Sequence, residues 1–190
     1  MKKIKMMMAA ALGVLVSCGS VKSGEEAIAA SRESKVVVAY VTSWSEVMPD
    51  PQYMTHINYA FGHVNESFNG VKIDNKERLR QIVDLRKQKP ELKVLLSIGG
   101  WGSGRFSEMA ANDEYRRAFA KDCDRVVKEF DLDGIDIDWE YPTSSMANIS
   151  ASPDDTENFT LLMKDIRAAI GDQKELTLAT VASAKYIDFK

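Results

Sequence analysis

The stretch Asp133-Gly134-Ile135-Asp136-Ile137-Asp138-Trp139-Glu140-Tyr141-Pro142 carries three acids at alternate positions. Strict alternation predicts a β-strand, in which residues two apart share a face. Asp136, Asp138 and Glu140 then point to one side, about 7 Å apart along the strand, and the apolar residues between them point to the other. Burying a row of acids is costly, because desolvation and like charges both oppose ionisation. The row therefore indicates a place where protons are moved rather than a packing element.

Apolar segments that alternate with amphipathic helices surround this strand. The expected strands cover residues 35–44, 56–64, 93–101, 133–140 and 175–183, and the expected helices begin near Asp74, Asn112 and Ser152. This order favours a parallel sheet with right-handed crossovers. No Gly-x-Gly-x-x-Gly or phosphate loop follows the first strand, which argues against a nucleotide-binding open sheet. Acids on one face in mid-strand are typical of the interior of a TIM (β/α)8 barrel that opens at its C-terminal mouth.

The alternation also assigns positions to the neighbours of the acids. Asp133, at the entrance of the strand, is expected to fix the start of the strand rather than to take part in chemistry. Trp139 points away from the acids and is expected to pack under the helices. Cys123 falls on the apolar face of the helix that begins near Asn112, where a packed thiol is the expected role.

Composition excludes several classes of protein. The chain has 190 residues and a net charge of −3, and no basic stripe indicates a nucleic-acid partner. Cys18 and Cys123 have no disulfide partner and no metal-type spacing. His56 and His63 are too few for a His-based metal site and are expected to be structural. We predict no cofactor and no metal.

A calcium loop is the one metal site that the acids imitate. The stretch from Glu129 to Glu140 fits most of the EF-hand pattern. Its first ligand is Glu rather than Asp, and Asp136 stands where that loop packs an apolar residue. Pro142 would also interrupt the exiting helix. Calcium binding is therefore the disfavoured interpretation.

The N-terminus predicts export. Three lysines precede a short apolar run at residues 6–16, which is too short for a spanning helix and is typical of a secretory signal. Leu15-Val16-Ser17-Cys18-Gly19 resembles a bacterial lipobox, in which the cysteine becomes a lipidated N-terminus. An ordinary signal peptide is the alternative. The expected organisation is a signal at 1–17, a flexible tether at 18–34 that links a lipid anchor at Cys18 to the domain, and a domain at 35–190. We therefore expect the protein to reside in the cell envelope.

Several motifs carry a family resemblance. Asp133-x-x-Asp136-x-Asp138-x-Glu140 closely resembles the signature of glycoside hydrolase family 18, and the longer DGIDIDWEYP resembles its chitinase version. Ser97-Ile98-Gly99-Gly100-Trp101 resembles the second signature of the family, on strand three. His56-Ile57-Asn58-Tyr59-Ala60-Phe61 resembles its strand-two segment, and Tyr40 with Trp44 resembles its first strand. The matches run in order over about residues 36–183.

This resemblance implies a TIM barrel that cleaves β-1,4 links between N-acetylglucosamine units with retention, by a substrate-assisted mechanism. Glu140 would be the general acid on the glycosidic oxygen. Asp138 would orient the acetamido group of the substrate, and Asp136 would hold Asp138 and share a proton with it. The two aspartates are expected to titrate as a coupled pair. The implied ligand is chitin or another N-acetylglucosamine oligosaccharide.

The same resemblance names substrate-binding residues, because the apolar face of a pyranose stacks on a flat aromatic ring. They are Tyr40, Phe61, Gly100, Trp101 and Tyr141. Ser97 is expected to form a hydrogen bond with Asp136. The family has non-proline cis peptide bonds at such strand ends, which makes Ala60–Phe61 and Glu140–Tyr141 candidates.

The sequence also departs from the family. Only about the first five of the eight barrel strands are expected, and the Met-x-Tyr-Asp motif of the sixth strand is absent. We therefore expect a fragment that is poorly soluble and inactive on chitin oligomers by itself. An endo-β-N-acetylglucosaminidase acting on the chitobiose core of N-glycans and a catalytically silent sugar-binding protein are the alternatives. Glu140 favours an enzyme, since silent relatives usually lose the acid.

Overall fold

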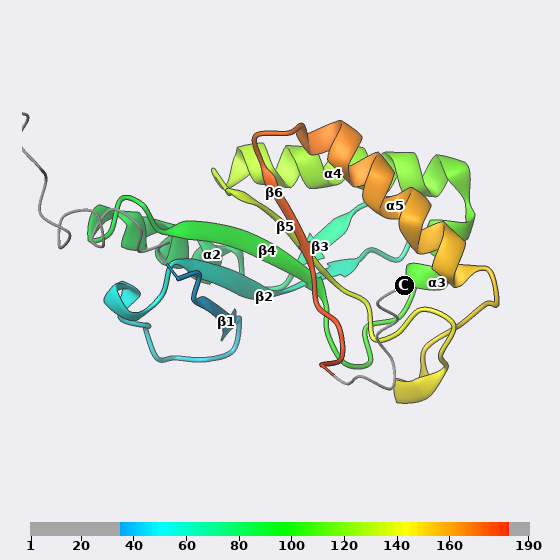
Figure 1. The fold of residues 1–190 in the computed structure, drawn as a ribbon, viewed down its shortest axis with the longest axis horizontal. Helices are drawn as coiled ribbons and strands as arrows, with labels where there is room; N and C mark the ends of the chain where they lie inside the picture. The colour runs from blue at the N-terminus through cyan, green and yellow to red at the C-terminus, as the bar shows by residue number, and fades with distance from the viewer. Residues whose placement is uncertain (1–34, 183–190) are drawn as a thin grey trace, which may run out of the picture. The chain divides into compact units, whose positions relative to one another are not determined.

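Strands and helices alternate along residues 35–182, which are the residues that this computed structural model describes (Figure 1). The strands are β1 (Val38–Thr42), β2 (His56–Val64), β3 (Val71–Ile73), β4 (Lys93–Gly99), β5 (Gly134–Asp138) and β6 (Glu175–Leu178). The helices are α2 (Lys76–Val83), α3 (Phe106–Ala111), α4 (Asp113–Glu129) and α5 (Asp155–Ile170). Short 3₁₀ turns cover Pro51–Tyr53, Asp84–Lys87 and Met146–Asn148. The expectations for the signal at 1–17, for Cys18 and for the tether at 18–34 lie outside the described residues.

The sheet has the strand order β1-β2-β4-β5-β6, and each neighbouring pair is parallel. Strand β3 pairs antiparallel with the end of β2, off this path. The five predicted parallel strands are thus confirmed, with a short link between the first two and helices between the others. They form part of a (β/α)8 barrel. Because Gly134–Asp138 is a strand of this sheet, the stretch does not form a calcium-binding loop.

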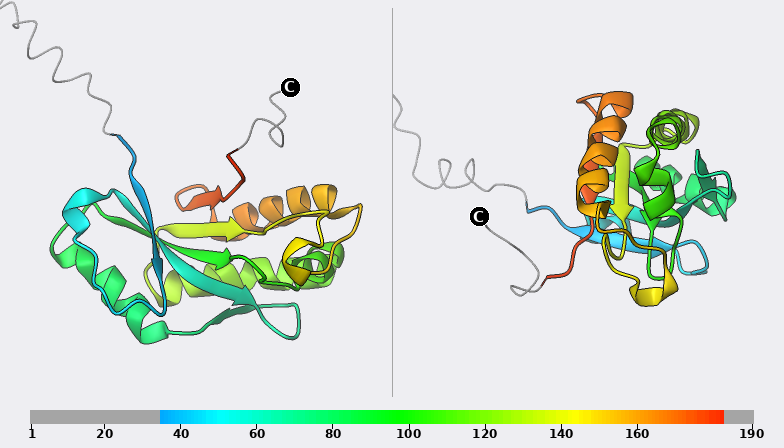
Figure 2. Two further views of the ribbon diagram at one scale, coloured as in Figure 1. Left: turned by 90° about the horizontal axis from the view of Figure 1, so that it is seen from below. Right: turned by 90° about the vertical axis from the view of Figure 1, so that its right-hand side faces the viewer.

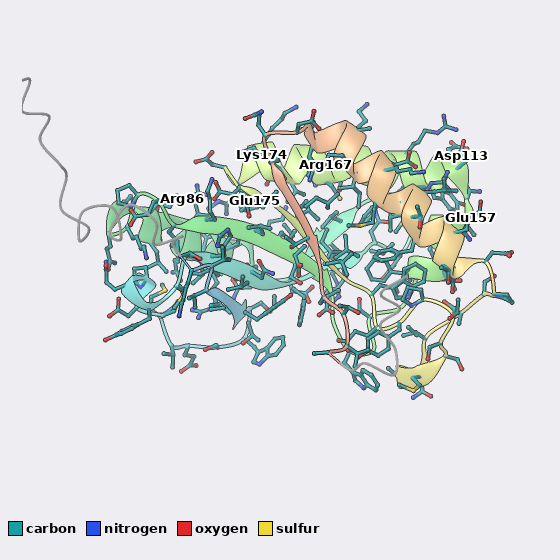
Figure 3. All side chains as sticks on the ribbon, viewed as in Figure 1. Arg86, Asp113, Glu157, Arg167, Lys174 and Glu175 are labelled. Atoms are coloured by element: carbon teal, nitrogen blue, oxygen red, sulfur yellow. The ribbon has the colours of Figure 1, made fainter. Side chains whose placement is uncertain are left out.

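All strands on the main path run toward the same end of the sheet. Figure 3 labels Asp113 and Glu157, in the first turns of α4 and α5, at one end, and Lys174 and Glu175, where β6 begins, nearer the other. The carboxyl ends of the strands therefore collect at the end where α4 and α5 begin. This is the barrel mouth, where TIM barrels place their active sites.

One face of the sheet is covered by helices and holds the apolar core (Figure 2). Buried strand residues on this outer face are Ile57, Tyr59, Val94, Leu96, Ile98, Ile135 and Ile137. They pack against the apolar stripes of α2, α4 and α5, which include Leu79, Ile82, Phe119, Val126, Leu162 and Ile166. Cys123 is fully buried in the same layer, which confirms the predicted packed thiol. Each fully buried large side chain contributes about 1.5–3 kcal/mol, so this layer is the main source of stability.

Several strands are shorter than the sequence predicts. Strand β4 ends at Gly99 rather than at residue 101, and β5 ends at Asp138 rather than at residue 140. Gly99 and Gly100 have positive φ angles of 132° and 92°. The chain of β4 therefore turns away, and the residues after Asp138 lose that ladder partner. Strands β1 and β6 are likewise confined to the residues that pair with β2 and β5.

The structure also corrects two helix starts and adds two elements. The cap of α2 is Asn75, whose side chain accepts from the Arg78 backbone N–H, rather than the expected Asp74. Helix α5 begins at Asp155 instead of Ser152. The three-residue strand β3 and the six-residue helix α3 were not predicted, because segments this short have no full period of hydrophobicity. Within residues 35–182, no helix is both long enough and apolar enough to cross a bilayer.

Candidate active site

The acid row starts on the inner face of β5, opposite the helices. Asp136 and Asp138 are 1% and 8% exposed. They share this face, as predicted, while Ile135 and Ile137 belong to the outer core. Glu140 follows two residues after the end of the strand and is partly exposed. The row thus runs from a buried carboxylate to an accessible one at the barrel mouth.

Both carboxylate oxygens of Asp136 accept hydrogen bonds from hydroxyl groups. Tyr40 of β1 and Ser97 of β4 donate to Oδ2 at 2.9 and 2.8 Å. Thr177 of β6 donates to Oδ1 at 2.6 Å. The predicted bond from Ser97 is confirmed. Three hydroxyl donors from three different strands thus fix this buried carboxyl group in place.

Asp138 lies between Asp136 and Glu140 and has an altered acidity. Burial raises the pKa of Asp138 from its ordinary 3.8 to about 6, and the charges of Glu140 and Asp136 add to this shift. Desolvation and like charges both disfavour the ionised carboxylate. Asp138 therefore keeps a proton into the mildly acidic range, where it can donate a hydrogen bond to an acceptor oxygen.

Two tyrosines border the row. Burial raises the pKa of Tyr40 to about 12, a hydrogen bond with Asn58 opposes the shift, and the charge of Asp136 adds to it. The phenol therefore stays protonated and remains a donor to Asp136. A hydrogen bond with Glu140 is the main cause of a raised pKa at Tyr141. Tyr40 and Tyr141 thus lie beside the acids, and their role in substrate binding stays a prediction.

Two glycines allow β4 and β2 to approach the row closely. A Cβ on Gly99 would lie 2.0 Å from the backbone oxygen of Asp138. A Cβ on Gly100 would lie 2.9 Å from the ring of Phe61. The Gly100 N–H donates to the Asp138 backbone oxygen at 2.9 Å. These positions require glycine both for space and for their positive φ angles.

The remaining predicted substrate-binding residues line a hollow of about 340 Å³ beside the row. Phe61, Gly100 and Trp101 form part of its wall, together with Trp44. The rings of Trp44 and Phe61 are 6.4 Å apart and inclined by 38°. Trp44 and Trp101 are 70% and 63% exposed. We call this the aromatic hollow.

Other sequence-based expectations near the row are confirmed. Trp139 is 2% exposed and stacks on Phe106 of α3, with ring centroids 5.3 Å apart. Asp133 Oδ2 accepts from the Val94 backbone N–H at 2.7 Å and from Arg86, which ties the start of β5 to β4. The peptide bonds Ala60–Phe61 and Glu140–Tyr141 are both cis.

Sequence reasoning missed several residues around the site. Asn58 of β2 and Thr177 of β6 lie on the inner face of the sheet. Residues two apart share a face, so Asn58 shares its face with Ala60 and Thr177 with Glu175. This alternation along each strand was the signal that would have found them. His63, expected to be structural, lines the aromatic hollow. Asp155 is fully buried and accepts from the Ser107 hydroxyl and from two backbone N–H groups. Its spacing from Ser152 fits a capping box at the start of α5, but nothing local in the sequence marks its contact with Ser107. Among residues 35–182, no three His, Cys, Asp or Glu side chains cluster to hold a metal ion.

Comparisons with known proteins agree with this geometry. Residues 36–190 match the family model of glycosyl hydrolases family 18. A probable chitinase 2 of Drosophila melanogaster is 35% identical over 177 residues, covering 81% of this chain and 36% of that protein. Chitinase A1 of Niallia circulans is 28% identical over 225 residues, covering 85% of this chain and 32% of that protein. The chain thus spans about a third of the length of these relatives.

Solved structures share the fold. The chitinase domain of the spore coat protein CotE from Clostridium difficile superposes with a TM-score of 0.76 at 40% identity, covering 81% of this chain and 44% of that one. A glycoside hydrolase family 18 N-acetylglucosaminidase from Paenibacillus barengoltzii superposes with a TM-score of 0.73 at 40% identity. The match covers 80% of this chain and 47% of that one. The family model matches, the sheet is part of a barrel, and the acid row begins on β5, the fourth strand of the parallel sheet. The chain belongs to glycosyl hydrolases family 18.

Proposed function

We propose that this chain carries the acid half of a chitinase-type active site, which cleaves β-1,4 bonds between N-acetylglucosamine units with retention. The observation that carries the proposal is the graded row on β5. Asp136 is buried and held by three hydroxyl donors, Asp138 has a pKa raised to about 6, and Glu140 is accessible. Unequal environments along a row of carboxylates assign them unequal roles.

Glu140 is the general acid in this proposal. It lies past the end of β5 at the mouth, where a glycosidic oxygen can reach it, and it is the most accessible acid of the row. Its proton passes to the leaving oxygen as the glycosidic bond breaks. The resulting carboxylate then takes a proton from a water molecule, whose oxygen attacks the anomeric carbon of the oxazolinium intermediate. This step opens the intermediate and restores the acid.

Asp138 and Asp136 serve the acetamido group of the substrate. In a substrate-assisted reaction, the acetamido oxygen attacks the anomeric carbon, and the nitrogen becomes positive in the oxazolinium ion. A carboxylate next to that nitrogen orients it and stabilises the charge. We assign this role to Asp138, which lies between Asp136 and Glu140 in the row. Asp136 lies beside Asp138 in the row and is fixed by Tyr40, Ser97 and Thr177.

The aromatic hollow supplies binding for sugars beyond the cleaved bond. Trp44, Phe61 and Trp101 present large ring surfaces next to the glycines of the β4 end. A pyranose ring has an apolar face that stacks on such rings, and its hydroxyls remain free for polar side chains. A similar solved structure holds a ligand: the Group IV chitinase of Ostrinia furnacalis was solved in complex with allosamidin. It is 30% identical to this chain, with a TM-score of 0.72.

The test is turnover of a chromogenic chitobioside by the full-length protein. We expect Glu140→Gln to lower kcat by about 10³-fold or more, because the glutamine cannot donate the proton. Glu91→Gln is the matched control, since Glu91 is an exposed carboxylate far along the chain from the row. Binding without turnover by the wild type would favour the sugar-binding alternative. A Glu140→Gln variant with full rate would remove Glu140 from the role of acid.

A second candidate is release of single N-acetylglucosamine units or cleavage within the chitobiose core of N-glycans. The 40% identity to the Paenibacillus barengoltzii N-acetylglucosaminidase supports this second candidate. Product analysis separates the candidates. A chitinase makes mainly disaccharide and longer products from chitohexaose, whereas an exo-acting enzyme makes monosaccharide from the start. Cleavage of a high-mannose glycopeptide would support the N-glycan substrate.

We propose separately that the protein is exported and anchored in the cell envelope through a lipid on Cys18, after removal of residues 1–17, with residues 18–34 joining the anchor to a catalytic domain at 35–190. The lipobox-like Leu15-Val16-Ser17-Cys18-Gly19 supports this. The test is incorporation of labelled palmitate in a bacterial host. We expect label in the wild type and none in Cys18→Ser. An unlabelled but exported wild type would favour an ordinary signal peptide.

A further inference from the structure

We propose that the start of α2 positions the two exposed tryptophans of the aromatic hollow and thereby sets how tightly the protein holds long substrates. The α2 brace, as we call it, consists of Asp74, Asn75 and Arg78. Its three side chains reach the loop that carries Trp44 and, through His63, the loop that carries Trp101. The inference rests on the proposed function, because it assigns the hollow to the sugar chain, and it adds positioning residues that do not touch the sugar.

Arg78 is the centre of the brace. It is 7% exposed, although it lies near the start of a surface helix. Its Nε donates to the backbone oxygen of Thr42 at 3.2 Å and its Nη2 to that of Val47 at 2.7 Å. No carboxylate within residues 35–182 forms a salt bridge with it. Its charge is therefore committed to backbone carbonyls on either side of Trp44.

Asn75 completes this arm. Its Nδ2 donates to the backbone oxygen of Ser43 at 3.1 Å, while its Oδ1 caps α2 by accepting from the Arg78 N–H. Its backbone oxygen accepts from the hydroxyl of Tyr59 at 2.7 Å. Tyr59 is fully buried in the core on β2. The loop at residues 43–47 is thus tied through Asn75 to a rigid strand.

The second arm runs to the other wall. His63 Nε2 lies 3.5 Å from Asp74 Oδ2, and His63 Nδ1 shares a hydrogen bond of 2.9 Å with Ser103 Oγ. The Ser103 N–H donates to the backbone oxygen of Gly100 at 2.9 Å, which closes a tight turn around Trp101. His63 also lies beside Phe61, with ring centroids 6.5 Å apart. One helix start therefore supports both walls of the hollow.

The brace matters because the two tryptophan side chains are mostly exposed, so little packing of their own holds them in place. Trp44 and Trp101 are 70% and 63% exposed, and both lie outside the strands. An exposed ring on an unsupported loop must be ordered when a ligand binds, which lowers affinity. Fixing the loops beforehand removes that cost. The benefit falls on substrates long enough to reach the hollow, and not on the chemistry at Glu140.

The experiment compares Arg78→Lys with Arg80→Lys. Lysine keeps the charge but has no planar fork to bond Thr42 and Val47 together. Arg80 lies two residues further along α2, is about half exposed, and pairs only with Glu77 among the described carboxylates. Asn75→Asp is a second variant, because aspartate keeps the cap and loses the donor to Ser43. The readouts are amide hydrogen exchange at residues 43–47, chitotetraose affinity by calorimetry in the Glu140→Gln background, where the ligand is not cleaved, and kinetics on chitotetraose and on an aryl chitobioside.

We expect Arg78→Lys and Asn75→Asp to speed exchange at residues 43–47 and to raise both Kd and KM for chitotetraose by about tenfold. We expect kcat on the chitobioside to stay within about twofold, and Arg80→Lys to match the wild type in every readout. Unchanged exchange would overturn the brace. Equal losses on both substrates would overturn its positioning role. A wild type that turns over nothing would contradict the proposed function alone, because exchange and calorimetry still decide the brace.

Discussion

The hydroxyl of Tyr40 lies 2.9 Å from Asp136 Oδ2, although β2 and β4 separate their strands in the sheet. In a flat sheet, three strand spacings amount to about 14 Å, which is more than a tyrosine side chain spans. The sheet must therefore curl until β1 faces β5 across its inner side. The contact between His56 of β2 and Glu175 of β6, at 3.1 Å, crosses the same number of strands. Both contacts report the curvature of a barrel wall.

Removing the Tyr40 hydroxyl weakens the hold on Asp136. We expect Tyr40→Phe to lower kcat on a chitobioside by about tenfold, since a hydrogen bond to a charged group is worth about 1.5–3 kcal/mol. Thermal stability changes little, because Tyr40 is 47% exposed. Tyr53→Phe is the control, because Tyr53 is 78% exposed and lies in the 3₁₀ turn Pro51–Tyr53, outside the sheet. Equal activity of Tyr40→Phe and the wild type would contradict the role of this bond.

The raised pKa of Asp138 predicts a pH-dependent cost to folding. Between its ordinary 3.8 and about 6, the native carboxyl binds a proton that the unfolded chain releases. The free energy of unfolding contributed by this group therefore falls as pH rises through that window, and it stays reduced above it. In Asp138→Asn this fall is absent, so the variant gains stability relative to the wild type from about pH 4 to pH 6. Urea unfolding across this range gives the two curves, and parallel curves would refute the shift.

Gly99 is predicted to tolerate no side chain. In Gly99→Ala the Cβ would meet the Asp138 backbone oxygen at 2.0 Å, and φ is +132°. We expect a loss of about 3 kcal/mol or more in the free energy of unfolding. Gly104→Ala is the matched control, since its Cβ would have no neighbour nearer than Ile149 at 3.9 Å. We expect a change below about 1 kcal/mol there. Similar losses in both variants would show that close approach is not the cause.

Asp155 is predicted to hold the loop that follows the acid row. Its Oδ1 accepts from the Ser107 hydroxyl at 2.7 Å, and its Oδ2 accepts from the N–H groups of Ser152 and Thr143 at 2.7 and 3.3 Å. Asp155→Ala leaves these donors unpaired and should cost about 3 kcal/mol of stability. Asparagine should restore most of it, because its oxygen can face the two N–H groups.

Asp154→Ala is the control for Asp155, because Asp154 caps α5 by position but forms no side-chain cap bond. We expect a cost below about 0.5 kcal/mol for it. Chemical denaturation of the three variants measures the differences. If Asp154→Ala were as damaging as Asp155→Ala, helix capping rather than the buried network would explain the loss.

The sequence predicted the features that follow from a regular hydrophobic period within one strand or one helix. Alternation placed Asp136 and Asp138 on one face and Trp139 on the other, and the structure confirms each position. Helical spacing found α4 and its buried Cys123. These predictions succeeded because a period of two or of 3.6 residues is a property of one segment alone.

The missed features depend on two segments at once. Thr177 matters because β6 pairs with β5 in a register that sets it beside Asp136. Asn75 rather than Asp74 caps α2, and Asp74 lies beside His63 of β2. The burial of Asp155 depends on Ser107, 48 residues away. No local pattern contains such information, since it arises only when the chain closes on itself.

The alternation of acidic and apolar residues in β5 also disfavours pairing of this strand in the wrong register. A slip of one residue would drive Asp136 and Asp138 into the apolar layer under the helices and expose Ile135 and Ile137 on the inner side. Glycine contacts on either flank act the same way, since a Cβ on Gly134 would stand 2.0 Å from the Glu175 backbone oxygen. Misaligned pairings are therefore far less stable than the native one. Asp136 and Asp138, which are proposed for catalysis, thus also help to specify the register of β5 in the sheet.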